Sequence, residues 1–174
     1  ACKAVEYLIS MGHKRIGFIY NAPLDKMTPN SLRHKGYLQA LEKHKIPFDP
    51  ALVATDYSVA SGYDFGFKMM NQLLIKNKDM TAVFAFADTV AIGAAKAVLS
   101  RGLRIPEDIS IIGFDGIEEA EYFHPSLDTI SQPAEQMALS SVELLFDMLK
   151  NGETKHLIYE SSLLRRGSCA PINN

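Results

Sequence analysis

Short apolar segments alternate with longer amphipathic ones along most of the chain. Strand-like segments, with apolar residues at consecutive positions, lie at 16–20, 52–54, 81–86 and 109–112. Segments with apolar residues three or four positions apart predict helices at about 4–11, 31–45, 59–76 and 88–101, with residues 21–30 as a loop. Strands and helices that alternate with short connections predict an α/β fold, with a parallel doubly wound sheet and helices on both faces.

The C-terminal part departs from this alternation. A helix is predicted from Ala134 to Lys150, with Met137, Leu145 and Met148 on its apolar side and Gly152 closing it. Residues 157–160 are a strand candidate, and a second apolar segment follows at 163–165.

Composition limits the classes of function that the chain can have. With 174 residues, 47% of them hydrophobic, and a net charge of -2, the chain predicts one domain without a basic DNA-binding face. No apolar run approaches the roughly 20 residues that span a bilayer, so we expect no membrane contact. Cys2 and Cys169 fit a reducing compartment, although one bridge between them stays open. Ala1 begins the chain within a helix, so we expect a piece of a longer protein, and the lack of a signal peptide then says little about its compartment. We expect a cytoplasmic protein.

The segment from Ile105 to Asp115 is the most informative part of the sequence. Its buried strand ends directly in Gly113, Phe114 and Asp115. The strand therefore delivers a carboxylate to the carboxyl edge of the sheet, where ligands bind in open parallel sheets.

Together with residues 124–133, this segment resembles the lactose-repressor (LacI/GalR) family of bacterial transcription regulators. The resemblance runs from about Ala4 to Ser168, and its order and spacing make it specific. Further matching stretches are Gly12-His13-Lys14-Arg15-Ile16, Arg33 with Gly36-Tyr37, Ser61-Gly62-Tyr63, Thr81-Ala82-Val83-Phe84, Asp88 with Ala91-Ile92-Gly93-Ala94, Gly102-Leu103-Arg104-Ile105-Pro106, and Leu164-Arg165 with Ser168.

The resemblance implies one lobe of a two-lobed, periplasmic-binding-protein-like core. Residues 1–130 correspond to the C-terminal lobe, residues 131–161 to a crossover and a segment of the mostly absent N-terminal lobe, and residues 162–174 to a return strand and tail. Operator DNA would be bound only through a headpiece absent from this chain. We therefore expect the helix at 134–150 to pack differently from family members, to pair with another chain, or to be poorly ordered.

The implied function is sensing of a small-molecule effector, a sugar or related metabolite, within a homodimeric regulator. A periplasmic sugar-binding protein is the alternative. An enzyme is not expected, because no Gly-x-Ser-x-Gly, His-Glu-x-x-His or phosphate-cradling motif is present. The five histidines are scattered without metal-ligand spacing, so neither a metal nor a cofactor is expected.

Five residues are candidates for effector binding: Arg33, Tyr57, Asp88, Asp115 and Gln132. Arg33 lies in the first turn of its predicted helix, where a cation opposes the helix dipole, and its family counterpart holds effector oxygens. A local carboxylate partner is its alternative. Asp115 matches an effector-contacting aspartate; its alternative is a cap for residues 116–121.

Each of the other three candidates also has a structural alternative. Tyr57 matches an aromatic residue that stacks on the effector ring, or closes the rim of the core. Gln132 contacts the effector or makes a hinge hydrogen bond. A helix cap is favoured over ligand contact for Asp88. For the dimer surface, the resemblance points to Ile92, Tyr122 and Phe123, and a two-fold dimer is expected.

Overall fold

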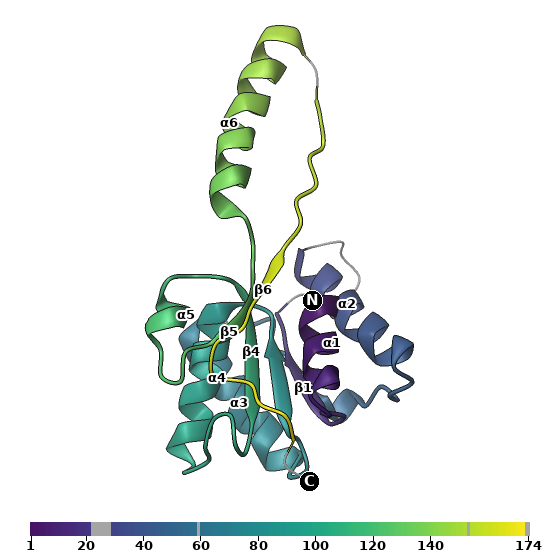
Figure 1. Ribbon diagram of the computed structural model, residues 1–174, viewed down its shortest axis with the longest axis vertical. Coiled ribbons are helices and arrows are strands. Elements are labelled where there is room, and N and C mark those ends of the chain that lie inside the picture. Colours follow the sequence, from purple (N-terminus) through teal and green to yellow (C-terminus); the bar gives the residue numbers. More distant parts are fainter. Residues whose placement is uncertain (22–28, 59, 153, 173–174) are drawn as a thin grey trace.

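A six-stranded sheet forms the centre of the molecule (Figure 1). The computed structural model describes residues 1–21, 29–58, 60–152 and 154–172. The strand order is β2-β1-β3-β4-β5-β6; all neighbours are parallel except β6, which is antiparallel to β5. The strands are β1 (Ile16–Ile19), β2 (Val53–Ala54), β3 (Ala82–Ala85), β4 (Ser110–Asp115), β5 (Asp128–Ser131) and β6 (Ser162–Leu164).

Helices cover both faces of the sheet, which confirms the predicted doubly wound α/β fold. In Figure 1, α1 (Cys2–Ser10) and α2 (Pro29–Lys43) lie on one face, and α3 (Tyr63–Lys76) and α4 (Asp88–Ser100) on the other. A 3-10 turn, η1 (Pro50–Leu52), precedes β2, and a short α5 (Glu119–Tyr122) precedes β5.

Two glycines bring α3 and α4 into close contact. A Cβ atom on Gly66 would clash with the Val90 carbonyl oxygen, and one on Gly93 would clash with the Tyr63 carbonyl oxygen. Each helix therefore lacks a side chain where the backbone of the other helix passes. This tight pairing fixes the loops that precede both helices at the carboxyl edge of the sheet.

A column of aromatic rings packs α2 onto the sheet. The Phe18 ring lies 5.0 Å from that of Tyr37, 5.1 Å from that of Tyr20 and 5.2 Å from that of Phe84, between ring centroids. All four side chains are buried. Burial of such a side chain contributes roughly 1.5–3 kcal/mol, so this column anchors α2 over the middle of the sheet.

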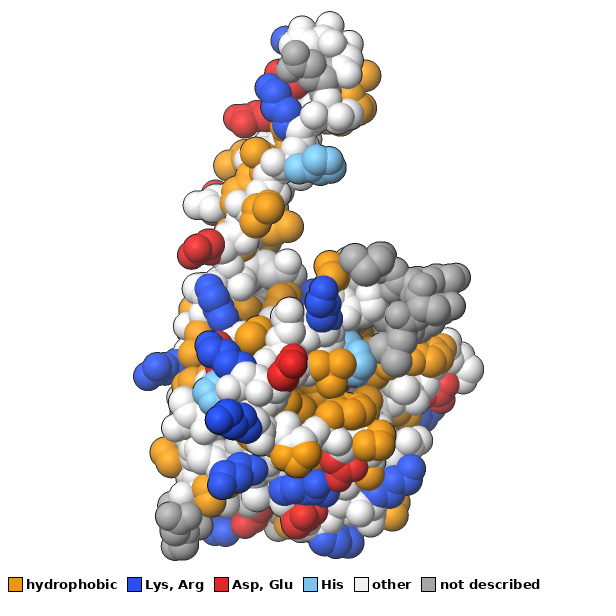
Figure 2. Space-filling view, turned by 90° about the vertical axis from the view of Figure 1, so that its right-hand side faces the viewer, with side chains coloured by type: hydrophobic (Ala, Val, Ile, Leu, Met, Phe, Trp, Pro, Cys, Tyr) orange, Lys and Arg blue, Asp and Glu red, His pale blue; other side chains and the backbone are white. Residues whose placement is uncertain are grey.

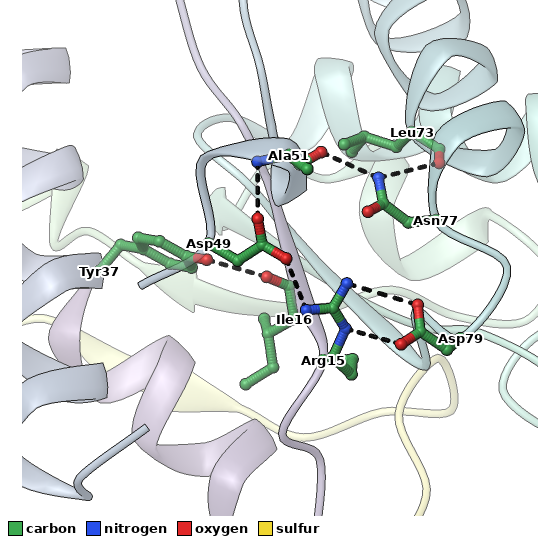
Figure 3. Close-up of polar contacts among 8 residues, drawn as sticks. All are labelled: Arg15, Ile16, Tyr37, Asp49, Ala51, Leu73, Asn77 and Asp79. Atoms are coloured by element: carbon green, nitrogen blue, oxygen red, sulfur yellow. Dashed lines mark hydrogen bonds and ion pairs between the residues drawn. The ribbon is translucent and has the colours of Figure 1, made fainter. Parts of the chain in front are cut away.

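Polar contacts hold the opposite, amino edge of the sheet (Figure 3). The Arg15 guanidinium lies 2.6 Å from an Asp49 carboxylate oxygen and 3.0 Å from one of Asp79. Tyr37 donates a hydrogen bond to the Ile16 carbonyl oxygen at 2.9 Å. The loops before β2 and β3 are thereby tied to the start of β1.

Several predicted boundaries need correction. The third helix was expected from about Val59, which lies outside the described residues; the helix begins at Tyr63, after Gly62. The strand predicted at 157–160 is wrong, because these residues belong to no strand. A strand needs a neighbour for its backbone hydrogen bonds, and only residues 162–164 of this region pair with β5. Most of the predicted loop at 21–30 lies outside the described residues.

The helix α6 (Ala134–Asn151) projects from the body, and residues 154–161 run back beside it (Figure 1). None of its residues is buried. Hydrophobic side chains are exposed along this arm (Figure 2). Among the residues of α6, Leu145, Phe146 and Leu149 are 50%, 57% and 70% exposed. The structure therefore leaves unpartnered the apolar side that the sequence predicted for this helix.

Buried His13 links folding stability to pH. Its Nδ1 lies 2.9 Å from Thr81 Oγ1 and its Nε2 lies 3.0 Å from the Ala170 carbonyl oxygen, so it ties β3 to the C-terminal tail. Burial lowers the pKa of His13 below its ordinary value, and the Ala170 hydrogen bond opposes that shift only in part. The unfolded chain therefore binds more protons once the pH falls below about 6.5.

We expect the free energy of unfolding to decrease as the pH falls below about 6.5. The variant His13→Gln should show a shallower decrease, and the exposed His156→Gln should keep the original slope. Urea denaturation at a series of pH values measures this dependence. An equal slope in His13→Gln and the parent protein would contradict the assignment.

Candidate functional site

Three of the predicted site residues meet at the carboxyl edge of the sheet. Arg33 Nη2 lies 3.3 Å from Asp115 Oδ1, and Gln132 Nε2 donates to the same oxygen at 2.7 Å. The Gln132 backbone N–H also donates to the Asp115 carbonyl oxygen at 3.1 Å. Arg33, Asp115 and Gln132 therefore form one hydrogen-bonded group, called the edge cluster below.

The sheet register dictates two members of the edge cluster. Asp115 is the last residue of β4 and pairs with Ser131 of β5, so Gln132 follows directly beside it. Asp115 has a φ of 120°, a backbone conformation that costs about 1–3 kcal/mol for a residue with a side chain. Strained backbone conformations of this kind are often found at functional sites, where they hold a side chain in one orientation.

Arg33 reaches the edge cluster from α2. Because this helix begins at Pro29, Arg33 lies in its second turn and not in the first, as predicted. The helix dipole acts mainly on the first turn, so its unfavourable effect on the Arg33 cation is weaker than the sequence predicted. Arg33 does have a carboxylate partner, as the alternative interpretation predicted. That partner is Asp115, which is itself a candidate for effector binding.

Burial dominates the electrostatics of the edge cluster. It raises the pKa of the Asp115 carboxyl, while Arg33 and the Gln132 hydrogen bond lower it. Burial likewise lowers the pKa of Arg33, and Asp115 only partly opposes this shift. The ion pair therefore compensates incompletely for lost hydration, and both groups would gain from further polar partners.

Phe114 is a member of the site that the sequence analysis did not single out. The Arg33 guanidinium carbon lies 4.2 Å from the centroid of the Phe114 ring. A cation over an aromatic face is attracted by the ring quadrupole, which holds the guanidinium plane in place. The signal was present in the Gly-Phe-Asp sequence, where Phe114 precedes the carboxylate.

Tyr57 lies on the same edge but contacts a different set of residues. Its hydroxyl oxygen is 3.2 Å from that of Tyr20, and its ring meets the Tyr20 ring edge-on. His34, next to Arg33, stacks on Tyr20 with ring centroids 5.0 Å apart. Tyr57 is 52% exposed whereas Tyr20 is 2% exposed, so only Tyr57 offers an open ring face. Tyr20 and His34 were missed because they read as core residues.

Asp88 lies beneath this edge and is fully buried. The prediction that it caps α4 is wrong: the cap position is Ala87, and Asp88 makes no capping bond. Its Oδ2 accepts hydrogen bonds from the backbone N–H groups of Gly116 and Ile117 at 2.7 and 2.9 Å. Its Oδ1 accepts one from the Thr129 hydroxyl at 2.6 Å. Asp88, and not Asp115, therefore holds the turn at 116–117. Because Asp88 is fully buried and both of its oxygens accept these hydrogen bonds, we do not expect it to contact a ligand directly.

The residues predicted for the dimer surface lie together elsewhere. Ile92, Tyr122 and Phe123 line a groove of about 420 Å³, and Tyr63 contributes to it. The groove continues into a second hollow lined by Phe67 and Lys96. Tyr122 is 79% exposed, so this apolar surface is open in the single chain.

Neither a metal centre nor a membrane span emerges from the described residues. No three His, Cys, Asp or Glu side chains among them are placed to hold a metal ion. None of the described helices is both long and apolar enough to cross a bilayer. Cys2 and Cys169 are free thiols.

The chain is similar to known proteins over nearly its whole length. The family described as the periplasmic binding protein-like domain matches residues 5–169. The chain belongs to this family. It is part of the effector-binding core of a LacI-family transcriptional regulator, a regulator domain and not an enzyme.

Individual relatives agree with this placement. The HTH-type transcriptional regulator MalR of Clostridium butyricum is 40% identical over 174 residues, 99% of this chain and 50% of MalR. A LacI family regulator from Enterococcus faecium with bound ribose has a TM-score of 0.88 at 30% identity, covering 99% of this chain and 62% of that one. The CelR–cellobiose complex has a TM-score of 0.86 at 31% identity, covering 94% and 49%. The chain spans about half the length of the curated relatives it matches.

Proposed function

We propose that the chain senses a sugar effector through the edge cluster, as half of the effector-binding core of a dimeric cytoplasmic regulator. The observation that carries this proposal is the convergence of Arg33, Asp115 and Gln132 at the carboxyl edge. Arg33 supplies several N–H donors, Asp115 supplies acceptors, and Gln132 supplies both. Such a set suits a polyhydroxylated ligand, whose hydroxyls donate and accept.

Asp115 retains capacity for a ligand. Its two hydrogen bonds from Arg33 and Gln132 both end on Oδ1, and Oδ2 accepts none from the described part of the chain. A hydroxyl donor at Oδ2 would stabilise a partly buried carboxylate. The open ring face of Tyr57 would cover the C–H face of a pyranose or furanose.

The matched structures support the sugar class, since one holds ribose and another cellobiose. The curated relatives are helix-turn-helix regulators, which favours a regulator over the alternative of a transport receptor. DNA binding is assigned to a headpiece outside these residues, because the chain has a net charge of -2 and no basic DNA-binding face is expected.

The arm formed by α6 belongs to the same proposal. Its exposed apolar side, including Leu145 and Leu149, would pack against the sheet of the other lobe. Residues 131–161 then form the crossover and part of that lobe, while residues 1–130 form the lobe described here. The two lobes would enclose the effector over the edge cluster.

A thermal-shift screen of sugars, sugar phosphates and nucleobases, on a regulator that carries this chain with both lobes, tests the function. A ligand that binds only the folded state raises the midpoint of unfolding. We expect a sugar to give the largest shift. A shift given by nucleobases alone would contradict the sugar assignment.

Substitution of the edge cluster should weaken effector binding. We expect Arg33→Ala or Asp115→Ala to cost roughly 1.5–3 kcal/mol, the range for a hydrogen bond to a charged group. Calorimetric titration of the effector found in the screen measures this loss. Arg104→Ala, which breaks an exposed Arg104–Asp108 ion pair away from this edge, is the matched control. Unchanged affinity in both cluster variants would exclude the site.

The groove at Ile92 and Phe123 is the proposed dimer surface. Glu118 and Glu119 line this groove, and Lys96 lines the hollow that adjoins it. A two-fold axis makes a patch face itself, so Lys96 of one copy can lie opposite a glutamate of the second. The apolar floor would be buried between the copies.

A charge in this floor should therefore disrupt the dimer. We expect Ile92→Asp and Phe123→Asp to sediment as monomers at micromolar concentration, because each buries an unpaired carboxylate in the interface. Ile75→Asp, on the exposed side of α3 and 62% exposed in the parent chain, should sediment like the parent protein. A monomeric parent protein would refute the proposal.

A further inference from the structure

A cavity lies at the amino edge of the sheet, the edge opposite to the edge cluster. It has a volume of about 560 Å³ and lies between the turns that follow α3 and α4, just before β3 and β4. Ligand pockets typically have volumes of about 300–1,000 Å³. The dimer groove and the crossover share no lining residue with it. Neither proposed interface would therefore cover it.

The cavity has an apolar wall that belongs to the core. Leu74, Met80 and Ile109 line it, and each is less than a tenth exposed. Because these side chains are packed between helix and sheet, the wall is preformed. An aliphatic group placed against it would be removed from water at little conformational cost.

Charged groups of both signs line the rest of the cavity. Lys78 and Glu107 make no hydrogen bond or ion pair with other described residues. The Arg101 Nε donates to the Asn71 side-chain oxygen at 2.8 Å, and its terminal amino groups make no hydrogen bond or ion pair with the residues that the structure describes. Asp108 also lines the cavity, but Arg104 already occupies both of its oxygens.

Asn77 adds an amide oxygen that can accept a hydrogen bond. Its side chain lines the cavity and the residue is only 5% exposed. The amide nitrogen donates to the carbonyl oxygens of Ala51 and Leu73, at 2.9 and 3.2 Å, whereas the amide oxygen accepts nothing from the described residues (Figure 3). This oxygen is open to solvent, because it is not among the buried polar atoms that lack a partner, so a ligand donor would take the place of water there.

We propose that this cavity binds a free α-amino acid with an aliphatic side chain. Lys78 and Arg101 would hold its carboxylate. The Asn77 oxygen and Glu107 would accept hydrogen bonds from its ammonium group, and the aliphatic side chain would lie on the wall of Leu74, Met80 and Ile109. An anion alone would leave Glu107 and Asn77 unused, and a neutral sugar would leave both cations unused.

Titration of the 174-residue chain with L-leucine, followed by the backbone amide signals of Asn77 and Ile109 in NMR spectra, tests the proposal. Saturable shifts of these signals are expected. N-acetyl-L-leucine lacks the ammonium group and L-leucinamide lacks the carboxylate. Each should bind at least about tenfold more weakly, as expected for a lost hydrogen bond to a charged group.

Variants assign the binding to this cavity. Arg101→Gln and Lys78→Ala should each weaken L-leucine binding by about tenfold. Lys76→Ala, which removes a lysine outside the cavity, should bind like the parent chain, as should Asp115→Ala at the opposite edge. Three results would overturn the proposal: no saturable shift with L-leucine, equal binding by the parent chain and the Arg101→Gln and Lys78→Ala variants, or equal binding of inorganic phosphate.

Discussion

The buried carboxylate of Asp88 organises the carboxyl edge of this lobe. It accepts hydrogen bonds from two backbone N–H groups at 116–117 and from the Thr129 hydroxyl, and among the described residues no cation pairs with it. Removing donors from a buried carboxylate is costly, so the turn after β4 is held firmly. Gly113 is part of the same constraint, because a Cβ atom there would clash with Asp88 Oδ1. The glycine of the Gly-Phe-Asp sequence is thus explained by a contact from Asp88 of α4.

This constraint connects the fold to its proposed function. Asp115 keeps its positive φ because the following turn is tied down by Asp88 and its carbonyl oxygen accepts from Gln132. The carboxylate is then presented to Arg33, which Phe114 holds by its ring. The edge cluster is therefore preorganised in the ligand-free chain, and little conformational entropy remains to be lost when a ligand binds.

The sequence predicted the sheet and its helices because apolar periodicity reports burial directly. The clustering of Arg33, Asp115 and Gln132 was predictable for a similar reason, since parallel strands end at a common edge. The role of Asp88 was not, because capping rules consider its own helix, whereas its partners are 28 to 41 positions away in the sequence. Tyr20 and His34 were missed since an aromatic residue at a strand end has the same pattern as a core residue. Residues 157–160 look like a strand in sequence but lack a neighbouring strand.

Amide hydrogen exchange at Gly116 and Ile117 tests most directly whether Asp88 holds this edge. In the parent chain both amides should be protected, because each donates to the carboxylate. In Asp88→Asn, the protection of these two amides should fall at least about tenfold, while that of Ile111 and Ile112 in β4 should persist. Unchanged protection of Gly116 and Ile117 in the variant would contradict the account.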